Sequence, residues 1–362
     1  MTTLLLLGGL VLLVVGGEVL VRGASGLARS FGLSPLVVGL TVVSFATSAP
    51  ELAVTVRASL SGSPGLAVGN VVGSNIANVL LVLGVAGLIL PLAVRRPVVR
   101  RDVPVLIALS VLFLLLSLNG TISRLDGAVL LALLVAYTTW AVLRSRRGHD
   151  EPSTDLPPSG PPPRSLVSVL LVAVGVGLLV VGAAWLVDGA TRVATSLGLS
   201  EIVIGLTVVA VGTSLPELAT SVIAAIRGDV EMAVGNAVGS CIFNIGAVMG
   251  MAAIFSPGGV PIEPSAVRFD LPVLVAVALA LLPIVFTGFT VERWEAGLFL
   301  ALYAAYVLYL LLDSAGHDAL PAYSSVMMLF VLPITALTLV LLATYELGLR
   351  RGRRESGSVG PS

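Results

Sequence analysis

Two glutamates stand inside long apolar stretches of this chain, each directly after a proline. They occur in the sequences Thr47-Ser48-Ala49-Pro50-Glu51 and Thr213-Ser214-Leu215-Pro216-Glu217. Proline has no N–H, so the carbonyls of Ala46 and Gly212, four residues earlier, lose their helical partner and become available as cation ligands. A carboxylate at the centre of a bilayer costs about 2.5 kcal/mol or more unless its charge is compensated. No basic residue lies in either stretch, which predicts that a bound cation compensates the two glutamates.

A polar stripe follows each of these segments. Residues spaced four apart share one helix face, and the stripes consist of Asn70, Ser74 and Asn78 in the first segment and Asn236, Ser240 and Asn244 in the second. Carboxylate, amide and backbone oxygens are the ligands that Ca²⁺ prefers. Cys241 is the only cysteine and both histidines lie in polar segments, so no soft-metal cluster is expected. Purely structural hydrogen bonding is the alternative role for the stripe. The accompanying Gly69-x-x-x-Gly73 and Gly235-x-x-x-Gly239 predict close helix packing.

The composition places these segments in a membrane. The chain of 362 residues is 57% hydrophobic and only 11% charged, against about 25% charged residues in a typical soluble protein. Stretches of roughly 20 apolar residues, the length that spans a bilayer, occur about eleven times. The sequence therefore predicts an all-α membrane protein.

The basic residues, all of them arginine, predict the orientation. With the N-terminus outside, sixteen arginines fall in cytoplasmic segments and four outside, which follows the positive-inside rule. We therefore expect a multi-pass protein of the cell (inner or plasma) membrane, surrounded by lipid, with its C-terminus in the cytoplasm.

The polar and apolar residues repeat in register. Residues 32–84 align without gaps with residues 198–250 at an offset of about 166, and about 29 of 53 positions are identical. Five spans in each copy, an odd number, make the second copy enter the membrane from the opposite side. Two inverted repeats are a transporter architecture with a binding site near the midplane. The predicted organisation is 1–147, first repeat; 148–164, Pro-rich cytoplasmic linker; 165–313, second repeat; 314–349, an eleventh transmembrane helix; and 350–362, a disordered cytoplasmic tail.

These two segments resemble the paired alpha repeats of the cation/calcium exchanger superfamily, in its sodium/calcium exchanger branch, over about 320 residues. The resemblance implies that Glu51 and Glu217 coordinate Ca²⁺ with the backbone oxygens of Thr47 and Thr213. It implies a central cluster completed by Asn78 and Asn244. It further implies Na⁺ ligands from the same glutamates, the side chains of Ser48, Ser74, Ser214 and Ser240, and the carbonyls of Ser44 and Ala210.

The chain departs from the pattern of the superfamily at four points. Many members carry aspartate where this chain has Asn244, which leaves two central carboxylates and puts the Na⁺ stoichiometry and any K⁺ dependence in doubt. Ala46 replaces a usual glycine and Cys241 a usual asparagine. The eleventh span exceeds the ten of the exchanger module.

The mechanism expected from these features is Ca²⁺/Na⁺ antiport by alternating access, in which the Gly-rich first and sixth spans slide past a nearly fixed central site. Antiport of H⁺ against Ca²⁺ or another divalent cation is the nearest alternative, because a buried glutamate can carry a proton, and a passive cation channel is a remote one. An enzyme is not expected, since no HExxH or Gly-x-Ser-x-Gly motif occurs. Neither a cofactor nor a nucleic-acid partner is expected, and the oligomeric state stays open.

Overall fold

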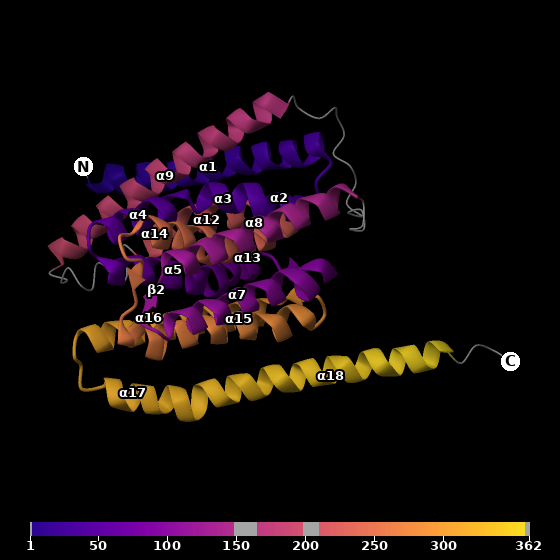
Figure 1. The fold of residues 1–362 in the computed structure, drawn as a ribbon. Coiled ribbons are helices and arrows are strands. Elements are labelled where there is room, and N and C mark those ends of the chain that lie inside the picture. Colours follow the sequence, from indigo (N-terminus) through magenta and orange to yellow (C-terminus); the bar gives the residue numbers. More distant parts are fainter. Residues whose placement is uncertain (1, 148–164, 198–209, 359–362) are drawn as a thin grey trace.

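The computed structural model describes residues 2–147, 165–197 and 210–358, which form a bundle of long α-helices (Figure 1). The first half consists of α1 (Thr2–Phe31), α2 (Pro35–Val38), η1 (Gly39–Val43), α3 (Ser44–Thr47), α4 (Ala49–Leu60), α5 (Pro64–Ala77), η2 (Asn78–Val82), α6 (Leu83–Ile89), β1 (Leu92–Ala93), η3 (Val98–Asp102), α7 (Val103–Ser117), β2 (Thr121–Ile122) and α8 (Arg124–Arg146). The second half consists of α9 (Ser165–Ser196), α11 (Ala210–Thr213), α12 (Leu215–Ile226), α13 (Val230–Phe243), η5 (Asn244–Met249), α14 (Gly250–Phe255), β3 (Val260–Pro261), η6 (Ala266–Asp270), α15 (Leu271–Phe286), β4 (Thr290–Val291) and α16 (Arg293–Ser314). The predicted linker, 148–164, lies outside the described residues.

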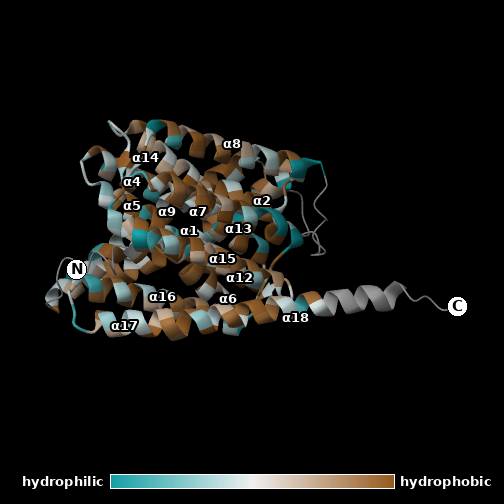
Figure 2. Ribbon diagram, turned by 60° about the horizontal axis from the view of Figure 1, so that its bottom comes forward, coloured by the Kyte–Doolittle hydropathy of each residue, from teal (hydrophilic) through white to brown (hydrophobic). Residues whose placement is uncertain are grey.

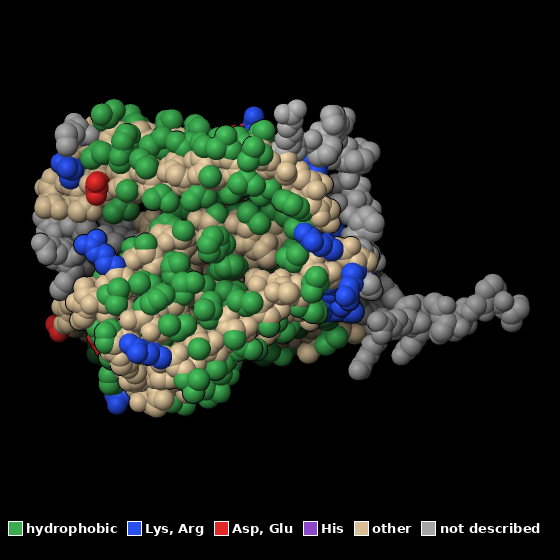
Figure 3. Space-filling view, turned by 45° about the horizontal axis from the view of Figure 1, so that its top comes forward, with side chains coloured by type: hydrophobic (Ala, Val, Ile, Leu, Met, Phe, Trp, Pro, Cys, Tyr) green, Lys and Arg blue, Asp and Glu red, His purple; other side chains and the backbone are tan. Residues whose placement is uncertain are grey.

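The surface and the helix lengths are those of a multi-pass membrane protein, as predicted. Within the described residues, eight helices are long and apolar enough to cross a membrane, and the bent pair 35–47 and 49–60 would be a ninth. Apolar residues dominate most of the helices (Figure 2). Hydrophobic side chains cover the middle of the face drawn in Figure 3, and its arginines lie towards the two ends. The span predicted near Ser110 corresponds to η3–α7. Of the span predicted near Val209 only α11 and α12 are described, so the total of eleven membrane spans stays a prediction.

The two halves repeat the same elements and exchange their short strands. β1 pairs with β4 and β2 with β3, both antiparallel, so each bridge joins one half to the other. α8 and α16 both begin with a capping box, at Ser123 and at Glu292 respectively. Tyr137 of α8 donates a hydrogen bond to Asp102 Oδ1 at 2.8 Å, and Tyr306 of α16 donates one to Asp270 Oδ1 at 3.1 Å. The repeat in the sequence is therefore also a repeat of local structure.

α1 and α9 lie directly against each other on one side of the bundle (Figure 1). Their glycines meet: a Cβ on Gly9 would lie 2.8 Å from the carbonyl oxygen of Gly182, and one on Gly16 would lie 3.0 Å from that of Gly175. The helices are antiparallel, because contacts move down α9 as they move up α1. The Gly-rich faces of the first and sixth spans, which the sequence predicts to slide past the central site, therefore pack against each other. Gly17 of α1 instead approaches α12, at Ile223 and Ala219.

Polar contacts also fasten α1 to the turn that follows α12. Arg227, at the end of α12, forms a salt bridge with Glu18 of α1, which also pairs with Arg22. Ser25 Oγ donates a hydrogen bond to Asp229 Oδ2 at 3.1 Å. α1 is thus held by both packing and charge.

The centre of the bundle is formed by one helix pair from each half, α5–α6 and α13–α14. The apolar windows of these spans are 72% and 78% buried within the protein, against 6% for the C-terminal span 320–348. The polar stripes predicted from the sequence lie on these two central spans, and all of their members except the half-buried Asn70 are buried.

The additional C-terminal helix forms, as α17 (Leu320–Val326), η7 (Met327–Val331) and α18 (Leu332–Ser358), and it packs along α15 at the edge of the bundle (Figure 1). α18 continues to Ser358, into the segment from 350 that the sequence predicts as a disordered tail. A helix that an apolar span has already nucleated can extend into a polar segment, because each added residue needs no new nucleus. Residues 359–362 lie outside the described residues.

Candidate functional site

Each proline-glutamate sequence breaks a helix at the serine two residues before the proline. Ser48 has φ −81° and ψ 4°, and Ser214 has φ −87° and ψ 3°, so both leave helical geometry in the same way. α2–α3 and α4 meet at an angle of 45°. Pro50 and Pro216 then occupy the first turn of the new helices, where a missing N–H costs nothing. The predicted breaks are present, and they place Glu51 and Glu217 in the first turns of α4 and α12.

Both glutamates are completely buried, and neither has a basic partner among the described residues. Within the part of the chain that the structure describes, neither carboxylate oxygen of Glu51 has a hydrogen-bond partner, nor does Glu217 Oε2. Glu217 Oε1 accepts a hydrogen bond from Ser48 Oγ of the other half at 3.3 Å, and the two carboxylates interact electrostatically. The helix N-termini offset part of the cost, but this contribution is at most about 2 kcal/mol. Each carboxylate therefore retains capacity for a cation.

Four further buried polar side chains, in the central spans and at the second helix break, have no hydrogen-bond partner among the described residues. The side chains of Asn78 and Asn244 are buried and unpaired, as are the hydroxyls of Ser74 and Ser214. Asn78 and Asn244 each begin a π-helical turn, η2 and η5, a distortion frequent at functional sites. Buried polar groups are normally satisfied, so this concentration of unsatisfied oxygens and amides next to two carboxylates indicates a site for a ligand.

Asn70 and Asn236 have a different role, which is to hold the broken helices in place. Asn70 Nδ2 donates to the carbonyl of Glu51 at 3.3 Å and to Thr55 Oγ1 at 2.9 Å. Asn236 Nδ2 donates to the carbonyl of Glu217 at 3.3 Å and to Ser221 Oγ at 2.9 Å. The identical pairs of distances show that the repeat extends to side-chain contacts, and they support the structural alternative for these two residues.

The second-half stripe also reaches across to the first half. Thr47 Oγ1 donates to Asn236 Oδ1 at 3.2 Å and lies 3.4 Å from Ser240 Oγ. Ser44 Oγ donates to the carbonyl of Asn236 at 3.1 Å, and the carbonyl of Ser44 accepts the N–H of Ser48 at 2.9 Å. The structure thus brings Ser44, Thr47, Ser48 and Ser240 together. Thr213 and Ala210 lie on α11, at the equivalent position in the second half.

Close helix approach makes these contacts between the halves reachable. A Cβ on Gly235 would lie 2.7 Å from the carbonyl oxygen of Leu36, and one on Gly239 would lie 2.7 Å from Leu40 Cα. The predicted glycine packing is therefore confirmed for the second pair. The segment that the repeat places opposite Gly69 and Gly73 falls in residues 201–209, outside the described residues.

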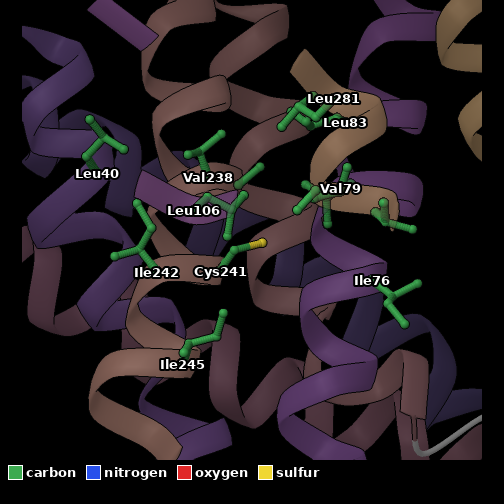
Figure 4. Close-up of a cluster of buried hydrophobic side chains, with 14 of the residues drawn as sticks. Leu40, Ile76, Val79, Leu83, Leu106, Val238, Cys241, Ile242, Ile245 and Leu281 are labelled. Carbon is green, nitrogen blue, oxygen red and sulfur yellow. The ribbon is translucent and has the colours of Figure 1, made fainter. Parts of the chain in front are cut away.

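Three polar residues near the site did not emerge from sequence reasoning. Thr55 and Ser221 lie four residues after the glutamates in both copies, a repeated hydroxyl that could have identified them. Asn75 is completely buried with both polar side-chain atoms unpartnered. Cys241, the equivalent residue, points its sulfur towards α5, 3.6 Å from the carbonyl of Asn75, among the apolar side chains of Figure 4. Within the described residues, no group of three or more His, Cys, Asp and Glu side chains gathers around one point.

Replacing Asn236 by alanine should destabilise the protein by about 1–3 kcal/mol, because the carbonyl of Glu217 and the hydroxyls of Thr47 and Ser221 would lose a buried partner. Thermal unfolding of the purified variant in detergent measures this effect. Asn119→Ala, at an exposed turn, is the control and should change stability by less than about 0.5 kcal/mol. If the Asn236→Ala variant were as stable as the control, Asn236 would not hold the broken helix in place.

Comparisons with known proteins show similarity in sequence and in fold. Residues 1–143 and 167–312 both match the sodium/calcium exchanger protein family. The inner membrane protein YrbG of Escherichia coli is 41% identical over 287 residues, covering 77% of this chain and 87% of YrbG. The sodium/calcium exchanger MaX1 of Methanosarcina acetivorans is 33% identical over 343 residues, covering 85% and 97%. A solved structure of the sodium-calcium exchanger NCX_Mj, soaked with Na⁺ and Ca²⁺, superposes with a TM-score of 0.73 at 34% identity, covering 85% of this chain and 97% of that one.

Proposed function

This chain belongs to the sodium/calcium exchanger family and is a membrane cation/Ca²⁺ antiporter, and from that premise we propose that it exchanges Ca²⁺ for Na⁺ by alternating access. The ions are its substrates, and no resident cofactor is needed. The observation that carries the proposal is the pair of buried carboxylates, Glu51 and Glu217, one from each half, without a basic partner among the described residues.

The charge of the site fits one Ca²⁺. Two carboxylates supply two negative charges, and the amides of Asn78 and Asn244 and the backbone oxygens freed at the helix breaks supply neutral ligands. Ca²⁺ takes six to eight oxygens in flexible geometry, which suits ligands from two broken helices. We assign the Ca²⁺ ligands to Glu51 and Glu217 with the carbonyls of Thr47 and Thr213.

Na⁺ is supported as counter-ion by the hydroxyls that surround the carboxylates. Ser74 and Ser214 are buried and their hydroxyls have no hydrogen-bond partner in the described part of the chain, and Ser48 contacts Glu217 directly. We assign Na⁺ to these serines and Ser240, to the carbonyls of Ser44 and Ala210, and to the shared glutamates. Because both kinds of ion need the same two carboxylates, binding of one excludes the other, and this exclusion couples the two fluxes. A proton-coupled exchanger would need the carboxylates but not the hydroxyls.

We further propose that the N-terminus lies outside and that the arginine-rich ends of the helices face the cytoplasm. This orientation puts Arg22 and Arg227, which both contact Glu18, on one side of the membrane. The Na⁺ gradient would then normally drive Ca²⁺ out of the cell.

Separate ion gradients across proteoliposomes test the counter-ion. Vesicles loaded with Na⁺ and diluted into Na⁺-free medium should accumulate ⁴⁵Ca²⁺, whereas vesicles loaded with K⁺ or given only a pH gradient should not. Uptake driven by the pH gradient alone would instead identify a proton-coupled exchanger. Protein-free vesicles with the same gradients give the leak, and single-channel conductance in a planar bilayer would identify a passive channel.

A further inference from the structure

A long apolar groove runs along the outer face of α8, away from the cation site. It has a volume of about 680 Å³ and is lined by Ala128, Leu131, Ala132, Val135, Ala136, Thr139, Trp140 and Leu143 of α8 and by Ile254 of α14. α8 and α14 pack against each other, so the groove has a floor on both helices. From Ala128 to Leu143 a helix rises roughly 22 Å, more than the roughly 15 Å that half the hydrocarbon core occupies. One lipid tail can therefore lie in it across a whole leaflet.

The groove ends in a cluster of two arginines and one tryptophan. The guanidinium of Arg101, from η3, lies 5.8 Å from the centre of the Trp140 ring, and that of Arg144 lies 5.7 Å from it. Arg144 Nε is buried and has no hydrogen-bond partner among residues 2–147, 165–197 and 210–358. Asp102, the acidic residue next to Arg101, accepts a hydrogen bond from Tyr137. The guanidinium groups of Arg101 and Arg144 therefore both contact the Trp140 ring at the end of the apolar groove.

We propose that this groove binds an anionic phospholipid, with its phosphate between Arg101 and Arg144 and one acyl chain along α8. Charge complementarity is the basis of the assignment, because the arginine pair can bind the anionic phosphate and the apolar groove can bind the acyl chain of the same lipid. Basic pockets at the ends of membrane helices bind anionic headgroups in this manner, and tryptophan favours the level of the headgroups. α8 is apolar along most of its length and becomes hydrophilic at its C-terminal end (Figure 2).

A second groove on the molecule shows what distinguishes this one. It has about 570 Å³ and lies between α4 and α14, lined by Leu52, Ala53, Val56, Arg57, Leu60, Ser61, Met251 and Phe255. Its lining includes one arginine and no tryptophan. It could therefore hold a lipid tail, but it lacks a pair of arginines that could bind the headgroup. The proposed selectivity for anionic lipid therefore belongs to the α8 groove.

The test measures lipid binding to the purified full-length protein by native mass spectrometry, with phosphatidylglycerol and phosphatidylcholine of identical acyl chains. The double variant Arg101→Gln/Arg144→Gln should bind phosphatidylglycerol about 30-fold more weakly, since each arginine near an anionic membrane surface contributes roughly five-fold. Its binding of phosphatidylcholine should not change. Arg146→Gln removes one positive charge in the last turn of α8, outside the cluster, and should change the binding of neither lipid.

Two further arms separate the parts of the site. Ala136→Trp fills the exposed floor of the groove without altering its charge, and it should weaken binding of both lipids. Glycerol phosphate, which carries the headgroup charge without a tail, should not displace bound phosphatidylglycerol. Equal phosphatidylglycerol affinity in the double variant and in Arg146→Gln, or displacement by glycerol phosphate, would overturn the proposal. Ion transport is not part of any arm, so the outcome does not depend on the proposed counter-ion.

Discussion

Glu217→Gln is expected to reduce Na⁺-driven Ca²⁺ uptake about a hundredfold or more, and Glu51→Gln should do the same. Glutamine keeps the size of the side chain and one oxygen ligand but removes a charge. Removing one partner of a buried ion pair costs about 3–5 kcal/mol, and every 1.4 kcal/mol is about tenfold in affinity. Initial rates of ⁴⁵Ca²⁺ uptake into Na⁺-loaded proteoliposomes measure the loss, and thermal stabilisation by added Ca²⁺ should disappear in parallel.

The matched control is Glu295→Gln, which changes another buried glutamate outside the site. Glu295 lies in α16 and its Oε2 accepts the N–H of Glu292 in a capping box, a role that glutamine also fills. Uptake by this variant should stay within about twofold of the unmodified protein, because the glutamine oxygen keeps the helix cap and the central site is not touched. Wild-type uptake by Glu217→Gln, or equal loss in Glu295→Gln, would refute the role of the central carboxylates.

Gly239→Ala is expected to be nearly as damaging to transport, although the change adds only a methyl group. A Cβ at this position would lie 2.3 Å from Ser44 Oγ, 2.7 Å from Leu40 Cα and 2.8 Å from the carbonyl oxygen of Leu40. Two of these atoms belong to the backbone of η1, so α13 and η1 must move apart. Overpacking of this kind costs about 1–3 kcal/mol, and it displaces Ser44, whose carbonyl we assign to Na⁺. We therefore expect both a lower unfolding temperature and at least about a tenfold loss of uptake.

Gly297→Ala separates this effect from the general consequence of replacing a helical glycine. A Cβ on Gly297, in the second turn of α16, meets no atom within 4 Å. Alanine there should be neutral or stabilising by about 0.5–1 kcal/mol, with unchanged uptake. If Gly239→Ala behaved like Gly297→Ala, the close approach of α13 and η1 would not matter for exchange.

The amino-acid sequence alone determined the features that lie within a single chain segment, such as the helix breaks and the missing basic residues. The breaks at Ser48 and Ser214 follow from prolines that lack an N–H. The lack of a basic residue in the two glutamate-bearing stretches is a property of the sequence, so the need for a mobile counter-charge could be argued without coordinates. The internal repeat predicted two matching sets of polar residues, and the hydrogen bonds of Asn70 and Asn236 match each other in partner type and distance.

Tertiary structure alone decided which groups meet across the two halves. Sequence spacing predicts which residues share a helix face. Which residues of a neighbouring helix they contact depends on how closely the two helices pack and at what angle they cross. Packing therefore assigned Asn236 to clamp Glu217 and Thr47, joined Ser48 to Glu217, and turned the glycines of α1 and α9 towards each other. It also left Asn75 buried and unpartnered, which a stripe spaced four apart could not reveal because Asn75 lies between its members. Local chemistry is written along one chain segment, whereas a site built from two broken helices exists only after both have packed.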